Sequence, residues 1–280
     1  MPLTTPEADA AWRPDEATFA AADAIPKALV LETSTVAGFV DGDAPKVRVA
    51  WVDDADAGFV PEGDEIPEAV PDLAEAVIAT GKIAQLLAPS NELFGQPGAS
   101  NALADSVERA VTKAANFAYI QQPDPGVIDQ TPPTGILNQG IVALATPVAD
   151  TLDPLVDLQA TLAEAGGNPT HMVVSPTAWA SLRKIKRATG SAESLLGVGA
   201  DDAQRVLLDL PVLVSSAVPA GTGLIVDKAA IVSAVGDVKI ARSEHAYFAA
   251  DRMGLRCTFR FGAKVVHPDR VGSFTVAAPA

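Results

Sequence analysis

The residue types that carry catalysis are few and scattered in this sequence. None of the three histidines, His171, His245 and His267, has a second His or Cys at i+3 or i+4 to form one wall of a metal site. Ser175 precedes a proline at an expected helix start rather than standing in G-x-S-x-G, and Cys257 lies within an expected strand. We therefore expect no catalytic residues, no metal site and no cofactor.

One acidic stretch approaches the spacing of a calcium loop. Asp54, Asp56 and Glu65 fall at positions one, three and twelve, but Phe59 stands where the sharp turn of such a loop needs glycine. A solvated acidic projection is therefore favoured over a calcium site. The sequence also lacks G-x-G-x-x-G and G-x-x-x-x-G-K-[ST], so we do not expect nucleotide binding.

Composition limits the possible partners. Twenty Lys plus Arg against 35 Asp plus Glu leave a formal net charge of −15, which repels nucleic acid and anionic membranes as a whole. A hydrophobic content of 48% predicts a folded chain, and no apolar run approaches the length of a membrane span. The single cysteine cannot close an intramolecular disulfide, and the N-terminus lacks the layout of a secretory signal. We expect a soluble protein from a reducing compartment.

Four segments stand out in the first half. The Pro-rich residues 1–28 predict an extended arm without a core of its own, and the alternating KVRVAWV over residues 46–52 predicts a strand. An acidic, Pro/Gly-rich segment follows this strand and leads to further apolar sequence. Together they predict a long projecting hairpin over about residues 45–76. Apolar residues at helical spacing predict a long helix over about residues 99–120.

The second half alternates helices and short strands after a turn-rich segment at residues 123–140, the expected domain boundary. Asp153-Pro154 and Ser175-Pro176 are helix-start signals. Near the end, LRCTFRFG predicts a half-buried strand with two unlike faces. One face carries Leu255, Cys257, Phe259 and Phe261, and the other carries Arg256, Thr258 and Arg260.

Two groups of basic residues could contact a partner. The run RKIKR at residues 183–187 is more typical of a solvated helix end, matched to the helix dipole, than of a nucleic-acid contact. Arg252, Arg256 and Arg260 are spaced by four, which keeps them on one face of an extended segment. Carboxylates of another chain could pair with them there, and an ordinary polar sheet face is an equal alternative.

The order of several short motifs supplies a resemblance. Trp51-Val52 is followed by V-P-E-G at residues 60–63, and both precede a strand and a long helix. The later motifs are K-I-A (82–84), S-N-E-L (90–93), P-T-G-I-L (133–137), V-V-S-P-T-A-W (173–179), L-P-V-L-V-S-S-A-V-P-A-G (210–221) and D-R-M-G-L-R-C-T-F-R-F-G (251–262). In this order they resemble the major capsid proteins of tailed phages, the Hong Kong 97 fold family, from about residue 28 to the end.

The resemblance implies an α+β fold with a peripheral domain, an apical α/β domain, an extended β-hairpin loop and an N-terminal arm. The peripheral domain would hold a β-sheet and a long spine helix. The implied boundaries are an arm at 1–28, a first peripheral part at 29–131, an apical domain at 132–235 and C-terminal peripheral strands at 236–280.

The implied function is that of a major capsid protein, which self-assembles as pentamers and hexamers into an icosahedral shell enclosing double-stranded DNA. The expected location is the virion, after assembly in the host bacterial cytoplasm. An encapsulin-type nanocompartment that holds cargo enzymes is the alternative, and an enzyme built on the α/β segment is a third. We also expect a portal, possible decoration proteins, DNA bound without sequence specificity, and no membrane partner.

The resemblance also suggests which residues join neighbouring subunits. We hypothesise that loop carboxylates meet Arg252, Arg256 or Arg260 of an adjacent subunit; the loop residues concerned are Asp53, Asp54, Glu62, Asp64 and Glu65, with Trp51 and Phe59 in the same contact. The loop has no lysine between Lys46 and Lys82, and no asparagine follows Asn168. A lysine–asparagine crosslink between subunits is therefore not expected. The chain has no room for an N-terminal scaffolding domain, so we expect a separate scaffolding protein.

Overall fold

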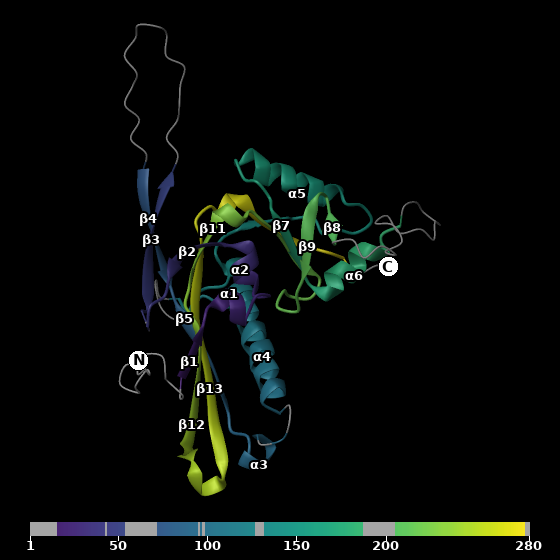
Figure 1. Cartoon of the computed structure of the whole chain (residues 1–280). Helices are drawn as coiled ribbons and strands as arrows, with labels where there is room; N and C mark the ends of the chain where they lie inside the picture. The colour runs from purple at the N-terminus through teal and green to yellow at the C-terminus, as the bar shows by residue number, and fades with distance from the viewer. Residues whose placement is uncertain are drawn as a thin grey trace, which may run out of the picture.

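One long strand organises the first sheet. The computed structural model describes residues 16–42, 44–53, 72–94, 96, 99–126, 132–186 and 205–277 (Figure 1). Strand β13 pairs on one side with β12 and β11, which follow one another along that side, and on the other side with β5. Strand β1 pairs with β12, and β2 pairs with β11. The bounds are β1 Glu16–Phe19, β2 Thr35–Phe39, β5 Gly81–Leu87, β11 Ile231–Val235, β12 Val238–Tyr247 and β13 Arg252–Val265.

A long helix covers one face of this sheet. Helix α4 (Ala99–Gln121) buries a stripe that includes Val107, Val111, Ala115 and Tyr119, spaced by four residues along one side. This stripe packs in one core with the apolar face of β13, as the alternation in LRCTFRFG predicted. The short helices α1 (Ala21–Ala24), α2 (Leu29–Thr33) and α3 (Asn91–Phe94) lie around it.

The N-terminal segment from residue 16 onward differs from the expected coreless arm. Strand β1 joins the sheet, and Ile25 and Ala28 are 1% and 0% exposed within the main core. Residues 1–15 lie outside the described part of the chain. The predicted boundary at residue 28 is therefore too late, because these elements are too short to show periodicity and are stabilised by distant partners.

A second sheet has the strand order β6-β14-β10-β7-β9-β8. Its strands are β6 Val142–Ala143, β7 His171–Val174, β8 Val206–Leu207, β9 Leu210–Val214, β10 Thr222–Val226 and β14 Val271–Thr275. Helices α5 (Asp153–Glu164) and α6 (Pro176–Lys184) pack their leucines against it. Ser175 caps α6 as expected, since its hydroxyl accepts a hydrogen bond from the amide of Ala178 at 3.1 Å.

The domain boundaries expected at 132–235 and 236–280 do not coincide with the division of the strands between the two sheets. Strand β11 belongs to the first sheet, whereas β14, near the C-terminus, pairs with β10 in the second. The chain therefore returns to the second sheet after β13. Sheet membership depends on pairing between residues far apart in sequence, which local patterns do not reveal.

A buried hydroxyl network fixes α2 between α4 and β11. The hydroxyls of Thr33 and Tyr119 lie 2.9 Å apart, and Thr33 also donates to the carbonyl of Leu29 at 2.8 Å. Ser34 donates to Ser233 at 2.7 Å. Burial is the largest cause of a raised pKa at Tyr119, so its phenol stays protonated and available for this network.

Strands β3 (Lys46–Asp53) and β4 (Asp72–Ala79) form a hairpin that comes close to β13 at Gly262. A Cβ at Gly262 would stand 2.0 Å from the carbonyl oxygen of Ala79, whereas one at Gly254 of the same strand would meet nothing nearer than 3.4 Å. We expect Gly262→Ala to lower the free energy of unfolding by about 1–3 kcal/mol because the backbones must separate. Urea unfolding of the unassembled subunit measures the change. Gly254→Ala is the control, and equal effects of the two substitutions would contradict this account.

Candidate inter-subunit surface

A two-stranded hairpin stands out from the body of the protein (Figure 1). Strands β3 (Lys46–Asp53) and β4 (Asp72–Ala79) pair antiparallel over their full length, with Asp53 opposite Asp72. Its base is held by a small core in which Ile78 is fully buried against β11. A hairpin is thus present where the sequence predicted one.

The predicted loop contacts fall in or beyond this hairpin. Trp51 and Asp53 belong to β3. The other members of the set lie outside the described residues, namely Asp54, Phe59, Glu62, Asp64 and Glu65. The pairing of β3 with β4 brings both ends of the acidic segment side by side at one end of the hairpin.

Two of the three predicted arginines are exposed on β13. Arg252 and Arg256 lie on the exposed side of the strand, and within the described part of the chain neither forms an ion pair with a carboxylate. Alternation along the strand places Cys257 on the opposite, buried face. Their guanidinium groups therefore remain available to a partner.

Arg260 has a different role within its own chain. It is partly buried, and its Nη1 donates to Thr80 Oγ1 at 3.1 Å and to the carbonyl of Ala44 at 3.4 Å. The Thr80 hydroxyl also donates to Ala44, at 2.5 Å. These bonds tie β13 to the residues that flank the hairpin base. The proposed contact with a neighbour is accordingly restricted to Arg252 and Arg256.

A hollow lies beside Arg256 on the face opposite α4. It has a volume of about 400 Å³, and its lining includes Leu86, Ala241 and Gly254 from three adjacent strands. Arg242 stands at its margin, paired with Glu244 at 2.6 Å and stacked 5.3 Å from the ring of Phe94. An apolar hollow beside the unpaired Arg256 suits a segment that carries both apolar and acidic side chains.

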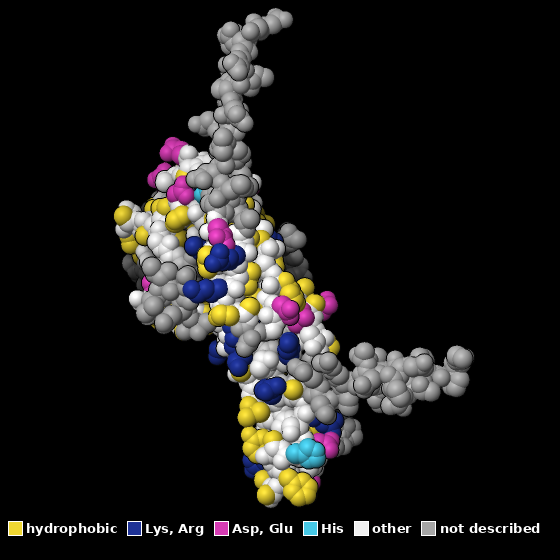
Figure 2. All heavy atoms as spheres, turned by 90° about the vertical axis from the view of Figure 1, so that its left-hand side faces the viewer, with side chains coloured by type: hydrophobic (Ala, Val, Ile, Leu, Met, Phe, Trp, Pro, Cys, Tyr) yellow, Lys and Arg dark blue, Asp and Glu magenta, His cyan; other side chains and the backbone are white. Residues whose placement is uncertain are grey.

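The same face gathers positive charge in an acidic protein. Figure 2 shows Lys and Arg side chains along the side of the molecule that faces away from α4. Strand register places Lys82 beside Arg260, and Lys239 beside Thr258, on this face. We call Lys82, Lys239, Arg256 and Arg260 the cationic face.

The candidates for enzyme chemistry have structural roles. Ser175 is a helix cap that is 1% exposed, and burial raises the pKa of the Cys257 thiol, which favours its unreactive protonated form. Burial is also the largest cause of the lowered pKa of His171. Among the described residues, no group of three or more His, Cys, Asp or Glu could hold a metal ion. None of the described helices is long and apolar enough to cross a membrane.

Two of the exposed apolar residues, Leu86 and Phe248, were not predicted from the sequence to be contact residues. Leu86 is 58% exposed on the cationic face, and Phe248 is 83% exposed at the turn between β12 and β13. That turn is pinned by a hydrogen bond of 2.6 Å from Asn91 Nδ2 to Asp251 Oδ1. The sequence did contain a signal for each of these two residues. Leu86 occupies a polar position of an alternating strand, and Phe248 is an aromatic residue within a turn.

The comparisons with known proteins agree with this architecture. A phage capsid family model matches residues 29–274. A chain from the capsid of an empty GTA particle is 20% identical with a TM-score of 0.66, and the match covers 90% of both chains. A chain from Gordonia phage Cozz is 17% identical with a TM-score of 0.67, covering 90% of this chain and 87% of that one. A chain from Mycobacterium phage Cain is 16% identical with a TM-score of 0.65 over 100% of both. No curated protein matches.

The match over most of the sequence defines the class of this protein. It belongs to the phage capsid family, as the motif order suggested. The Hong Kong 97-like α+β fold inferred from the sequence is confirmed by its similarity to these structures. The chain is thus a capsid protein, and an encapsulin-type compartment is not favoured.

Replacing Arg260 tests its role at the hairpin base. Arg260→Met keeps much of the apolar stem but removes the donors to Thr80 and Ala44, and hydrogen bonds from a charged group contribute about 1.5–3 kcal/mol. We expect amide exchange across residues 46–53 and 72–79 to quicken roughly ten-fold or more, measured by mass spectrometry on the unassembled subunit. Arg256→Met is the control on the same strand. Unchanged exchange in Arg260→Met would show that the hairpin is held without this side chain.

Proposed function

We propose that this chain is the major capsid subunit of a tailed phage, assembling with copies of itself as pentamers and hexamers into an icosahedral shell. The observation that carries the proposal is the projecting β3–β4 hairpin within a phage capsid family fold. Among the described residues, the body buries the base of the hairpin, and we expect the residues beyond the base to gain their contacts from a neighbour.

Charge supports a contact between the hairpin of one copy and β13 of the next. Residues 53–72 contain eight carboxylates and no Lys or Arg. Arg252 and Arg256 are exposed and unpaired among the described residues, and Arg256 lines the hollow at Leu86. Opposite charges on two copies of one chain favour association in a fixed orientation.

The remaining roles follow from a shell that encloses double-stranded DNA. The net charge of −15 disfavours wide contact with DNA, which suits packing without sequence recognition. We place the protein in the virion after assembly in the host cytoplasm, with a separate scaffolding protein, a portal and possible decoration proteins as partners. It acts as a structural protein and not as an enzyme.

Assembly of the purified protein is the direct test. Negative-stain electron microscopy, with sedimentation velocity on the same sample, should show closed particles or rings of five and six subunits. The protein is expressed alone and together with a candidate scaffolding protein. A stable monomer at every concentration under both conditions would refute the proposal.

Charge reversal at Arg256 tests the inter-subunit contact. Arg256→Glu places a carboxylate against the acidic loop of the neighbour, so we expect the concentration needed for assembly to rise about ten-fold, equivalent to about 1.4 kcal/mol. Sedimentation velocity measures that concentration. Lys264→Glu makes the same change at another exposed site of β13 and serves as the control. Equal assembly of wild type and Arg256→Glu would remove Arg256 from the contact.

A further inference from the structure

Strand β5 has one free side. It pairs with β13 over all seven of its residues, and no other described strand or loop pairs with its outer edge. Such an edge presents a row of unpaired backbone N–H and C=O groups, a ready template for another extended segment. A strand added there would make its backbone hydrogen bonds without a change in the fold.

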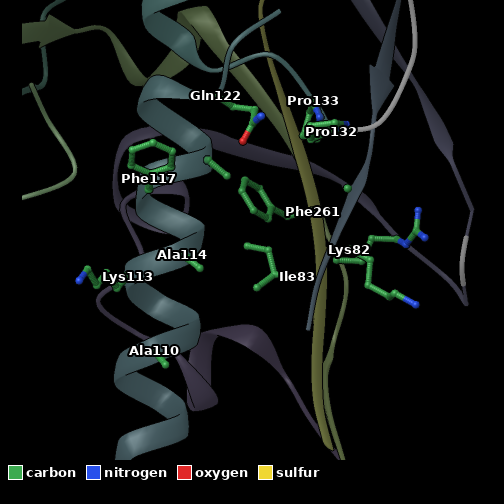
Figure 3. Close-up of a pocket in the computed structure, with 13 residues that line it drawn as sticks. Lys82, Ile83, Ala110, Lys113, Ala114, Phe117, Gln122, Pro132, Pro133 and Phe261 are labelled. Carbon is green, nitrogen blue, oxygen red and sulfur yellow. The ribbon is translucent and has the colours of Figure 1, made fainter. Parts of the chain in front are cut away.

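A groove lies beside this edge. It has a volume of about 860 Å³ and runs between β5, α4 and the Pro132-Pro133 turn. Figure 3 shows Ile83 and Phe261 pointing toward Ala114 of α4, while Lys82 points to the other side of the sheet. Phe117, which also lines the groove, remains 48% exposed. A segment placed here would meet apolar side chains on one side and cations on the other.

Strand β5 also carries a buried polar atom that has no hydrogen-bond partner among the described residues, the side-chain oxygen of Gln85. The Oε1 of Gln85 is buried and accepts no hydrogen bond from the described residues. By alternation Gln85 lies on the α4 side of β5, as do Ile83 and Leu87. A buried acceptor without a donor costs about 1–3 kcal/mol. A segment against β5 could supply that donor.

We propose that residues 7–13 (EADAAWR) of a neighbouring copy add to the outer edge of β5 as a further strand. In an extended conformation, apolar and acidic side chains of this segment would point to opposite sides, as the apolar and cationic surroundings of β5 require. Ala8, Ala10 and Trp12 share one face, which suits the apolar groove against α4. Glu7, Asp9, Ala11 and Arg13 share the other face, where the carboxylates of Glu7 and Asp9 suit Lys82 and the rest of the cationic face.

Geometry requires that the segment come from a second copy. Strand register places Glu16, Ala241, Arg256 and Leu86 in one row across the sheet. The outer neighbour of β5 therefore lies four strand spacings from Glu16, roughly 19 Å at about 4.8 Å each. Three residue steps from residue 13 to Glu16 span at most roughly 11 Å. The added strand thus links two subunits.

The other acidic segment of the chain is a poorer occupant. Residues 54–71 join two strands that already pair with each other as far as Asp53 and Asp72. The contact proposed for them lies on the cationic face, near Arg256. Residues 1–15 instead precede a single described strand, β1, so no pairing between two flanking strands fixes where they lie.

Site-directed disulfide formation in assembled particles tests the proposal, which rests on the proposed shell. Subunits carrying Asp9→Cys are assembled with subunits carrying Lys82→Cys, Ala84→Cys or Leu86→Cys, then oxidised mildly and run on a non-reducing gel. We expect a disulfide-linked dimer with at least one of the three partners. Ala10→Cys is the matched control, because its side chain would face α4 and yield no dimer. The only native thiol, Cys257, is 1% exposed.

The outcomes separate this proposal from the shell itself. Particles that form without any Asp9 dimer overturn the added strand alone, as does equal crosslinking of Ala10→Cys. Dimers from Asp56→Cys in place of Asp9→Cys would assign the groove to the hairpin and also overturn it. Wild-type protein that never assembles refutes the proposed function.

Hydrogen exchange on wild-type protein gives a readout that needs no substitution. Amides of residues 81–87 that face outward should exchange at least ten-fold more slowly in particles than in free subunits. Equal exchange in the two states would overturn the proposal even where the cysteine variants fail to assemble.

Discussion

Backbone pairing along both sides of β13 is the constraint on which the rest of the structure depends. The strand is 14 residues long and joins β11, β12 and β5 into one sheet. Because alternation divides its side chains between two faces, Phe259 and Phe261 stack 5.4 Å apart beneath α4, while Arg256 and Arg260 face the other way. The position of α4 and the charge of the opposite face thus follow from one strand.

The two faces of this sheet differ in packing and in charge. The α4 face is closed by apolar packing and by the Thr33–Tyr119 hydrogen bond. Among the described residues, the hairpin and the residues at its base cover the opposite face near β11 and near Arg260 and Gly262 of β13. The rest of that face carries cations in a chain of net charge −15. Such local charge separation lets identical subunits attract one another in a defined orientation despite overall repulsion.

Local patterns predicted the elements better than their partners. The α4 periodicity and the alternation around Cys257 are properties of neighbouring residues, and both were recognised from sequence. The packing of Ile25 and the placement of β14 in the second sheet depend on residues far away along the chain, so they were missed. The spacing of Arg252, Arg256 and Arg260 predicted a shared side of the strand. It could not show that Arg260 donates a hydrogen bond to Thr80, whereas Arg252 and Arg256 form no ion pair with any carboxylate in the described ranges.

The direction of β13 has a mechanical consequence. Its hydrogen bonds to β5 and β12 run across the strands, so tension along the strand axis loads them in shear. Bonds loaded in this way share the force and must break together, whereas bonds in an unzipping geometry break one after another. A wall built from such strands is stiffest along their length and yields more easily where they can be peeled apart.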